Sequence, residues 1–420
     1  MKTFVTRRVV IRLLWVLGFG VAGLVVYAWR SALPPADPPS ADSFNADTIR
    51  RGAQLAALGD CATCHTAPDG ETFAGGRPLA TPFGTIYSTN ITPDLTTGIG
   101  RWSLAAFERA MREGVDRQGA HLYPAFPYDH FTLLDDADGA ALYAFIMTRQ
   151  PVHAQTPDNH LPFPLNMRFL VAGWKLLFFH EGPYQPDAAH NLEWNRGAYL
   201  ANGIGHCGAC HTPRNSFGAE IRTRQFAGGE AEGWHAYAIN SDSQSHAAWN
   251  AEALHAFLSR GWHEQHGDAH GPMAPVSQSL AAAADSDVQA IATYVAAEMG
   301  NPKHDKPAAD PPNNDTGAAI YTAACANCHD GTRPLPFGGI KLTLSTAATG
   351  ETPTNLINVI LIGLHPPEGT AGAIMPGFAS TLTDGQLESL LSYIRANFGA
   401  RPPWTGVESS VREARSRVSD

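Results

Sequence analysis

The chain has 420 residues, a formal net charge of -10, and 44% hydrophobic residues. This length is too great for one small core and favours about three domains of ordinary size. The acidic balance argues against nucleic acid as a partner, because phosphates would be repelled and no run of Lys and Arg follows the N-terminus.

The N-terminus is basic and then apolar. Residues 9–29 are apolar except for Arg12, and basic residues precede them. A stretch of about 20 such residues predicts a transmembrane anchor within residues 1–30, with its basic end in the cytoplasm. The alternative is a cleaved signal peptide, with Val26-Tyr27-Ala28 as cleavage site. Both interpretations export the rest of the chain to the periplasm, and a proline-rich tether is predicted over residues 31–44.

Three copies of one pentapeptide organise the chain. They are Cys61-Ala62-Thr63-Cys64-His65, Cys207-Gly208-Ala209-Cys210-His211 and Cys325-Ala326-Asn327-Cys328-His329. In Cys-X-X-Cys-His the two thiols bond covalently to the porphyrin and the imidazole ligates the iron. We therefore predict three covalently bound haem c groups, held by these six cysteines, with His65, His211 and His329 as iron ligands. Zinc sites and thioredoxin-like redox pairs also use Cys-X-X-Cys, but three copies each followed by His favour haem.

Each motif lies between two segments with helical patterns. A glycine stands 9, 10 and 8 residues before the first cysteine, at Gly52, Gly197 and Gly317, where it would let another helix approach closely. Closing helices are predicted over 134–147, 287–297 and 382–398, with Asp135, Asp285 and Asp384 as candidate caps. This repetition predicts an all-α fold of three tandem class I cytochrome c domains, at residues 45–155, 189–300 and 310–400, behind the N-terminal transmembrane anchor.

The sixth iron ligands are sought among the seven methionines of the chain. Met273 lies 62 residues after His211 on a Pro/Gly loop, and Met375 lies 46 residues after His329 on another. Both precede by seven residues a leucine that leads into the closing helix. A thioether ligand raises the reduction potential relative to a second imidazole, so this shared position predicts Met273 and Met375 as ligands.

The first motif departs from this rule. The same offset falls on Phe126, which cannot ligate iron, so the first haem is either five-coordinate or takes another ligand. The alternatives are His130, His121, Met111 and Met147. His130 follows Phe126 by four residues on the same loop and is the candidate we name for this site.

Two further segments carry apolar side chains. Residues 156–188 include an almost uniformly apolar stretch at 161–180, which suits either a helix buried between domains or one that docks on a membrane or a partner. The tail, residues 401–420, predicts a helix with a narrow apolar stripe, either lying on lipid or a partner or solvated at the terminus.

From about residue 49 to residue 398 the chain resembles the three-haem cytochrome c subunits of bacterial membrane-bound dehydrogenases. Beyond the haem motifs, the resemblance rests on three strings, Asn90-Ile91-Thr92-Pro93-Asp94, Thr97-Gly98-Ile99-Gly100-Arg101-Trp102-Ser103 and His121-Leu122-Tyr123-Pro124-Ala125. In that family a methionine usually follows the Tyr-Pro-Ala string, where this chain has Phe126. The chain looks like the branch paired with a molybdenum hydroxylase.

The resemblance implies an electron relay. A separate catalytic subunit with molybdenum, flavin or quinone, accompanied in some branches by an iron-sulfur subunit, would supply electrons, and ubiquinone or a terminal oxidase would accept them at the periplasmic side of the inner membrane. No independent catalytic site is expected, since the chain has no Gly-rich dinucleotide loop and no spare cysteine. The alternatives are a haem-bearing subunit of a terminal oxidase and a multi-haem peroxidase.

Overall fold

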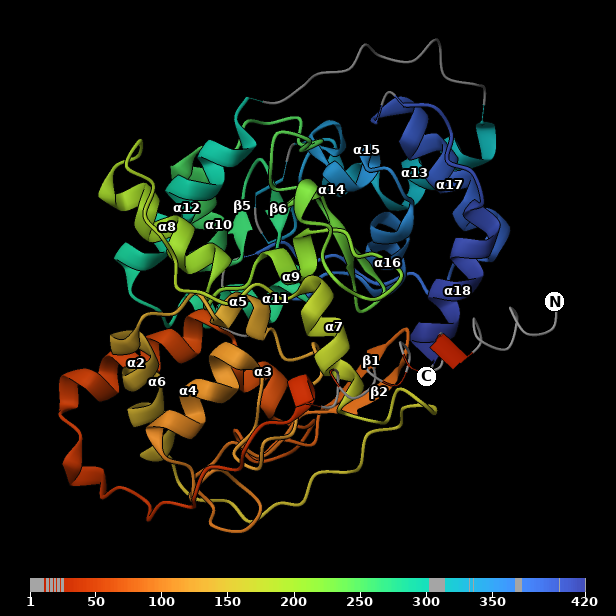
Figure 1. Cartoon of the computed structure of the whole chain (residues 1–420). Coiled ribbons are helices and arrows are strands. Elements are labelled where there is room, and N and C mark those ends of the chain that lie inside the picture. The colour runs from red at the N-terminus through yellow and green to blue at the C-terminus, as the bar shows by residue number, and fades with distance from the viewer. Residues whose placement is uncertain are drawn as a thin grey trace. The chain divides into compact units, whose positions relative to one another are not determined.

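The computed structural model describes residues 11–419 apart from 13–14, 16–17, 19, 21–22, 24–25, 302–313, 332, 335, 367–371 and 400. The chain divides into two compact units, unit 1 (Met1–Gln185) and unit 2 (Pro186–Asp420) (Figure 1). Unit 1 contains the first haem motif, and unit 2 contains the second and the third.

Unit 1 is organised by two crossing helices, α2 and α6, which flank the first motif. Asn45 caps α2 by accepting the N–H of Thr48, and Asp135 caps α6 by accepting the N–H of Asp138, as predicted for Asp135. The elements of unit 1 are η1 (Ala41–Ser43), α2 (Ala46–Leu58), α3 (Cys61–His65), β1 (Pro78–Thr81), β2 (Gly84–Tyr87), α4 (Leu104–Glu113), α5 (Tyr128–Phe131), α6 (Asp136–Met147) and α7 (Leu170–Phe178).

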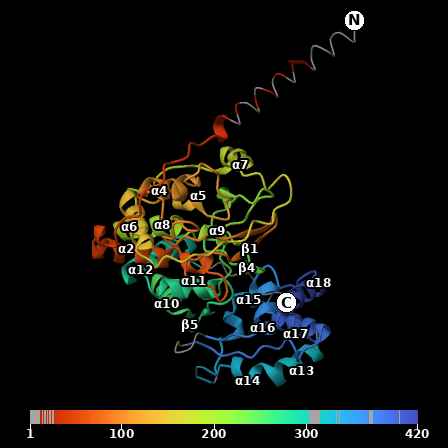
Figure 2. The ribbon, with the colours of Figure 1, turned by 90° about the horizontal axis from the view of Figure 1, so that it is seen from below.

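Unit 2 contains two such helix pairs, α8 with α12 and α13 with α17. Its elements are α8 (Leu192–Asn202), α9 (Gly208–His211), η2 (Arg222–Arg224), β3 (Gly229–Ala231), β4 (Trp234–Ala236), α10 (Ala251–Arg260), β5 (Trp262–His263), β6 (Gly267–Asp268), α11 (Met273–Leu280), α12 (Asp285–Met299), α13 (Asp315–Ala324), α14 (Ala326–His329), η3 (Leu342–Leu344), α15 (Thr346–Thr349), α16 (Thr354–Ile362), α17 (Asp384–Asn397) and α18 (Val407–Ser419). Helices α15 to α18 pack together around one apolar core (Figure 2).

The three predicted glycines lie where the paired helices cross. A Cβ on Gly52 would come within 1.9 Å of the Ala141 carbonyl oxygen, and one on Gly197 within 1.9 Å of the Ala290 carbonyl oxygen. In the third pair, a Cβ on Gly317 would come within 2.4 Å of the Ser389 carbonyl oxygen. No real side chain tolerates such contacts, so the predicted role of these glycines in close helix approach is confirmed.

Charged side chains support two of the three crossings. Arg51 on α2 binds Asp138 on α6, with 2.9 Å between Nε and Oδ1, and Arg196 on α8 binds Asp287 on α12 at 2.8 Å. Both aspartates are buried, so these bidentate pairs compensate charges that are removed from water. In the third pair the residue before Gly317 is Thr316, which offers no such charge.

Two predicted caps are displaced. Asp285 is the first residue of α12, and its side chain does not cap that helix. Thr383, which precedes Asp384, caps α17 in a reciprocal pair with Gln386. Aspartates in a first helical turn still favour the helix through its dipole, which explains why the sequence signal was shifted by only one residue.

In the part of the chain that the structure describes, three short antiparallel hairpins interrupt the helices, namely β1–β2, β3–β4 and β5–β6. The expectation of an all-α fold of three tandem class I cytochrome c domains is wrong in its three separate domains, and it did not include these strands. The strands were missed because runs of two to four residues carry too little alternation to be recognised. The second and third motifs also share one compact unit, since the region around α16 packs on strand β4.

The predicted N-terminal transmembrane anchor is likewise not part of the described fold. Among the residues that the structure describes, no helix is long and apolar enough to cross a membrane. Eleven of residues 9–29, on which that prediction rested, lie outside the described residues.

Helix α7 is anchored to unit 1 by one face. Val171, Ala172 and Lys175 are buried, and the Lys175 ammonium donates to the carbonyl oxygens of Glu113 and Gly114 at the end of α4. Leu176, on another face, is 64% exposed. Helix α7 is therefore no fully buried core helix.

Candidate haem sites

The histidine of each motif is oriented by the same kind of hydrogen bond. His65 Nδ1 lies 2.7 Å from the Thr89 carbonyl oxygen, and His211 Nδ1 lies 2.6 Å from that of Tyr237. His329 Nδ1 lies 2.8 Å from the carbonyl oxygen of Ile340. A carbonyl can only accept, so each Nδ1 carries the proton and each Nε2 keeps its lone pair. This is the tautomer that an iron ligand requires.

The protonation of these imidazoles agrees with that role. Burial lowers the pKa of His65 and the pKa of His211 below the ordinary value, while the hydrogen bonds to Thr89 and Tyr237 act in the opposite sense. Neutral imidazole is the form that binds metal. The local environment therefore prepares both side chains for ligation.

The first cysteine of each motif is held as a thiol. Burial, followed by the neighbouring Cys64, raises the pKa of Cys61 to about 12, and burial together with Cys210 raises the pKa of Cys207 to about 12. Burial and its motif partner raise the pKa of Cys325 to about 11. Burial is the first cause of the shift at all three cysteines.

The chain after the first motif folds back onto the motif histidine. Gly75 N–H donates to the His65 carbonyl oxygen at 2.7 Å, and Phe73 N–H donates to the Thr66 hydroxyl. Phe73 itself has a φ of 65°. A left-handed backbone is uncommon for a bulky residue, and it turns the loop back toward the motif.

The second motif repeats this arrangement. Gly228 N–H donates to the His211 carbonyl oxygen at 2.9 Å, Phe226 N–H donates to the Thr212 hydroxyl, and Phe226 has a φ of 60°. The matching Phe-Ala-Gly-Gly strings thus mark one local structure built twice. The third motif differs, because Gly339 lies against the imidazole itself: a Cβ there would come within 2.8 Å of His329 Cε1.

The string from Asn90 to Asp94 supports the first site. The buried Asn90 side chain donates to the carbonyl oxygen of Val152 at 2.8 Å and accepts from both the backbone and the hydroxyl of Thr92. Asn90 directly follows Thr89, whose carbonyl orients His65. The string therefore fixes the hydrogen-bond acceptor of the proximal histidine.

The two methionines predicted as sixth ligands both lie in unit 2, Met273 at the start of a helix and Met375 outside the helices. Met273 is the first residue of α11, and Met375 pairs with Leu364 through two backbone hydrogen bonds of 2.9 and 3.0 Å. Both side chains are partly exposed. Their ligation of iron remains a prediction.

Comparison with known proteins shows which family the chain is similar to. A family model described as "Cytochrome c" matches residues 49–150, and one described as "Cytochrome C oxidase, cbb3-type, subunit III" matches residues 312–394. The chain is 38% identical to the fructose dehydrogenase cytochrome subunit of Gluconobacter japonicus over 87% of this chain and 82% of that protein. It is also 38% identical to the gluconate 2-dehydrogenase cytochrome c subunit of Pantoea cypripedii, over 85% and 87%.

The chain belongs to the cytochrome c subunits of bacterial dehydrogenases. It is also 46% identical to a nicotinate dehydrogenase subunit of Pseudomonas putida over 95% of its own residues, but it spans about a third of that protein, 34%. Cytochrome c domains bind haem covalently through Cys-X-X-Cys-His. The two matched models correspond to two domains, which again corrects the predicted three.

Hydrogen bonds reduce the number of candidates for the sixth ligand of the first site in this cytochrome subunit. His121 is buried, with Nε2 3.0 Å from the Ala28 carbonyl oxygen and Nδ1 3.1 Å from Lys175 Nζ, so neither ring nitrogen is left for iron. His130 is buried in the short helix α5. Phe126 packs edge-on against Phe131, with ring centroids 5.2 Å apart. His130 stays our prediction for this site.

Several residues that shape the haem sites of the cytochrome subunit could not be recognised from the sequence. Thr89, Tyr237 and Ile340 act through backbone carbonyls, which every residue possesses. Gly339 lies ten residues beyond its motif, and its role depends on tertiary contact with His329. A glycine at such a distance from a motif is at least visible in the sequence, but nothing in the sequence marks the carbonyls.

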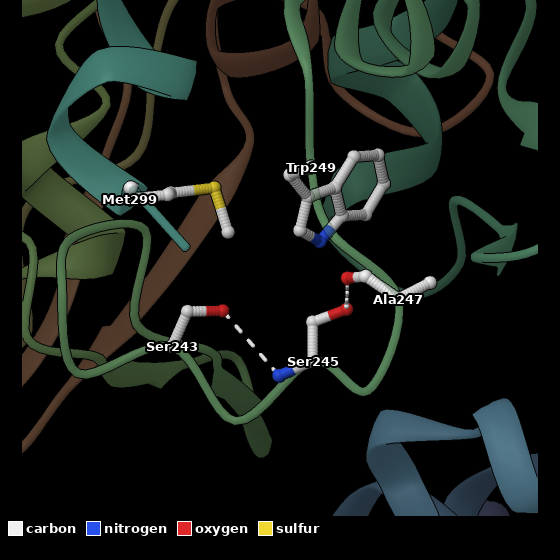
Figure 3. A pocket seen from close by; sticks show the side chains of 6 residues that line it. Ser243, Ser245, Ala247, Trp249 and Met299 are labelled. Carbon is white, nitrogen blue, oxygen red and sulfur yellow. Dashed lines mark hydrogen bonds between the residues drawn. The ribbon is translucent and has the colours of Figure 1, made fainter. Parts of the chain in front are cut away.

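The small pocket in Figure 3 carries no ligand site. Ser243, Ser245, Ala247, Trp249 and Met299 line it together with Gly300, and its volume of about 10 Å³ suits a single water molecule. The Ser245 hydroxyl donates to the Ala247 carbonyl oxygen, so the polar lining is already partly satisfied.

Proposed function

We propose that this cytochrome subunit carries three haem c groups and passes electrons from a catalytic dehydrogenase subunit to a separate acceptor. One observation carries the proposal: all three motif histidines have Nδ1 bound to a backbone carbonyl and Nε2 left as a potential ligand. The third motif lies within a matched cytochrome model, as does the first. The second motif lies outside both models, and its likeness to the first in backbone and hydrogen bonds supports a haem there too.

The residues of the chain have distinct tasks in this proposal. Haem iron, when bound, accepts and donates single electrons. The six motif cysteines would hold the porphyrins, and His65, His211 and His329 would ligate the irons. Met273 and Met375 would raise the potentials of the second and third sites, whereas His130 would keep that of the first site lower.

The partner proposed is a dehydrogenase with a molybdenum cofactor and an iron-sulfur subunit. The likeness to a subunit of nicotinate dehydrogenase supports this choice over a flavin or quinone enzyme. Ubiquinone or a terminal oxidase would collect the electrons on the periplasmic side of the inner membrane. Periplasmic attachment of haem c supports that location.

A haem count tests the proposal. Pyridine haemochrome assay of the purified chain should give three haems per molecule. Replacing both cysteines of one motif, as in C207A/C210A, should give two, and the matching C61A/C64A and C325A/C328A variants should do the same. A count of two in the wild-type chain that C207A/C210A leaves unchanged would refute a haem at the second motif.

Contact with a membrane surface is the second part of the proposal. Large apolar side chains are exposed on α7 and the segment before it: Phe163 is 79%, Leu176 64% and Leu177 67% exposed. Exposed apolar patches of this kind mark protein or membrane contact sites. We assign this patch, defined by Phe163, Leu176 and Leu177, to the bilayer surface.

The patch is tested by L176S/L177S. Because each serine removes most of the apolar area of one side chain, we expect the variant to shift from the membrane to the soluble fraction while its haem count stays unchanged. The control is L192S, since Leu192 is 90% exposed but lies in unit 2 outside the patch. Equal release of both variants would contradict the assignment.

The match of residues 312–394 favours a second candidate, a subunit of a terminal oxidase. The likeness to dehydrogenase subunits extends over most of the chain, whereas this match is confined to the third motif region. Affinity purification from mild detergent separates the two functions. Recovery of a copper-containing oxidase core in place of a dehydrogenase would favour the oxidase.

A further inference from the structure

We propose that Asn355 and Asn358 on α16 are positioning residues, which lock the β3–β4 hairpin of the second haem site onto the region of the third. The inference rests on the proposed function, because it assumes haem at the second and third motifs. It concerns how this chain holds two electron carriers in a fixed relation inside unit 2.

Asn355 pairs with the outer edge of strand β4. Its Oδ1 accepts the backbone N–H of His235 at 2.9 Å, and its Nδ2 donates to the His235 carbonyl oxygen at 2.8 Å. The side-chain amide thus replaces the neighbouring strand that this edge lacks, giving both backbone groups a partner. Asn355 is only 4% exposed, so water is a poor substitute for these bonds.

Asn358, one turn further along α16, holds the hairpin turn. Its Nδ2 donates to the Gly233 carbonyl oxygen at 3.0 Å, and the side chain is 3% exposed. Glu232 and Gly233 both have positive φ, 48° and 78°, which is typical of the tight type I′ turn. Two side chains on one face of α16 therefore bind both the strand β4 and the turn of the β3–β4 hairpin.

The hairpin that α16 binds is directly connected to the second haem site. Tyr237 follows the last residue of β4, and its carbonyl oxygen accepts the Nδ1 proton of His211. Tyr237 is also close to the third region, since a Cβ on Gly350 would lie 3.4 Å from its ring. Movement of the hairpin relative to α16 would thus shift the group that orients the His211 imidazole.

Helix α16 belongs equally to the third haem site. Leu356, Ile357, Ile360 and Leu361 of α16 are buried in the core that also contains Tyr321, from the helix before the third motif. The asparagines therefore join the acceptor of one proximal histidine to the packed core behind the other. Loss of this lock should loosen the relation between the two sites without emptying either.

The experiment compares N355A with a matched control in the purified haem-loaded chain. Hydrogen exchange at the His235 amide reports the lock itself, and EPR of the oxidised chain reports the geometry of each low-spin haem. Electron equilibration between the haems is followed after flash reduction. We expect N355A to speed His235 exchange, to broaden the EPR signal of one haem, and to slow electron equilibration between the haems several-fold.

The control is N195A, which removes an amide of the same kind. Asn195 accepts the Asp187 N–H at 2.6 Å and donates to the Asp187 carbonyl oxygen at 2.8 Å, and it is also buried, but both partners precede the second motif. It should lower stability without altering haem EPR or equilibration. The milder N358A, which loses one hydrogen bond, keeps the test available if N355A does not fold, and it should change the same signals less.

The outcomes separate the positioning role from the proposed function. Fewer than three haems in the wild-type chain would refute the proposed function. Three haems, with EPR and equilibration in N355A and N358A equal to those of N195A, would refute only the positioning role. Altered signals in N355A and N358A with unaltered signals in N195A would support that role.

Discussion

The hairpins β1–β2 of unit 1 and β3–β4 of unit 2 occupy matching places after their motifs, but their outer edges have different partners. In unit 1, Thr85 exchanges two backbone hydrogen bonds with His160, at 3.1 and 2.8 Å. In unit 2, the corresponding residue His235 is bound by the side chain of Asn355, 120 residues away in the sequence. The edge of β2 is completed by residues 159–160 of its own unit. The edge of β4 is completed by helix α16, in the region of the third motif.

This difference explains why three sequence repeats give two compact units. A strand edge must find donors and acceptors wherever it is buried. Residues 159–160 supply them within unit 1, which closes that unit upon itself. The second repeat takes them from α16, so its folding depends on the third repeat. Three changes should test this difference, and their expected effects decrease from the first to the last.

A side chain at a helix crossing should have the largest effect. G197V places a Cβ within 1.9 Å of the Ala290 carbonyl oxygen, and G52V does the same at Ala141. We expect each to cost about 3 kcal/mol or more, because the helices must separate. Calorimetry combined with haem absorbance should show G197V lowering the transition of the second and third sites together, and G52V lowering that of the first alone. A third-site transition unaffected by G197V would contradict the shared unit.

The second-largest effect is expected in the pH dependence of stability, which should have opposite signs in the two units. In unit 1, burial lowers the pKa of Lys175 to about 7, so the unfolded chain binds more protons between pH 7 and 10 and the stability of unit 1 rises across that window. In unit 2, burial raises the pKa of Asp268 to about 7, so stability present below pH 4 is lost as pH rises toward 7. At about 1.4 kcal/mol per pKa unit, each trend should amount to about 4 kcal/mol.

Melting of each unit as a function of pH, in wild-type, K175M and D268N chains, checks this prediction. The difference between each variant and the wild type isolates one group from the other titrating side chains. K175M should remove the rise in unit 1 only, and D268N should remove the fall in unit 2 only. A variant that alters the pH response of the other unit would show that the units are not independent.

The smallest effect is expected at the edge of the first hairpin. N159A removes the side chain that accepts the Tyr87 N–H at 2.8 Å, while the backbone bonds of His160 remain. We expect unit 1 to lose about 1 kcal/mol, and less than unit 2 loses in N355A, where both edge partners disappear. Urea titration of both variants measures the two costs. An equal loss would remove the distinction between the two edges.

The sequence predicted those features that depend on neighbouring residues. The motifs, the glycines at Gly52, Gly197 and Gly317 and the Asp135 cap all follow from local chemistry, and the structure confirms the glycines and this cap. The dehydrogenase family was also recognised, on short strings such as Asn90-Ile91-Thr92-Pro93-Asp94. These strings are informative because they support the acceptor of a ligand histidine.

Features that depend on distant residues could not be predicted. The pairing of Asn355 with His235 spans 120 residues and uses a side chain that is common on any surface. The count of three domains failed for the same reason, since the sequence repeats the helix pair but gives no sign of which repeats share a core. The predicted caps Asp285 and Asp384 are instead the first residues of their helices. Aspartate favours the first helical turn as well as the cap, so the sequence does not distinguish the two positions.

The protonated thiols of the folded chain impose an order on its biogenesis. Burial raises the pKa of the Cys61 thiol to about 12, so the thiolate is scarce there at neutral pH. The thiolate is the reactive species, so a polypeptide that matures its tertiary structure first would be nearly inert toward porphyrin vinyl groups. We therefore expect porphyrin to be attached more readily before the helices around the motif have closed than after.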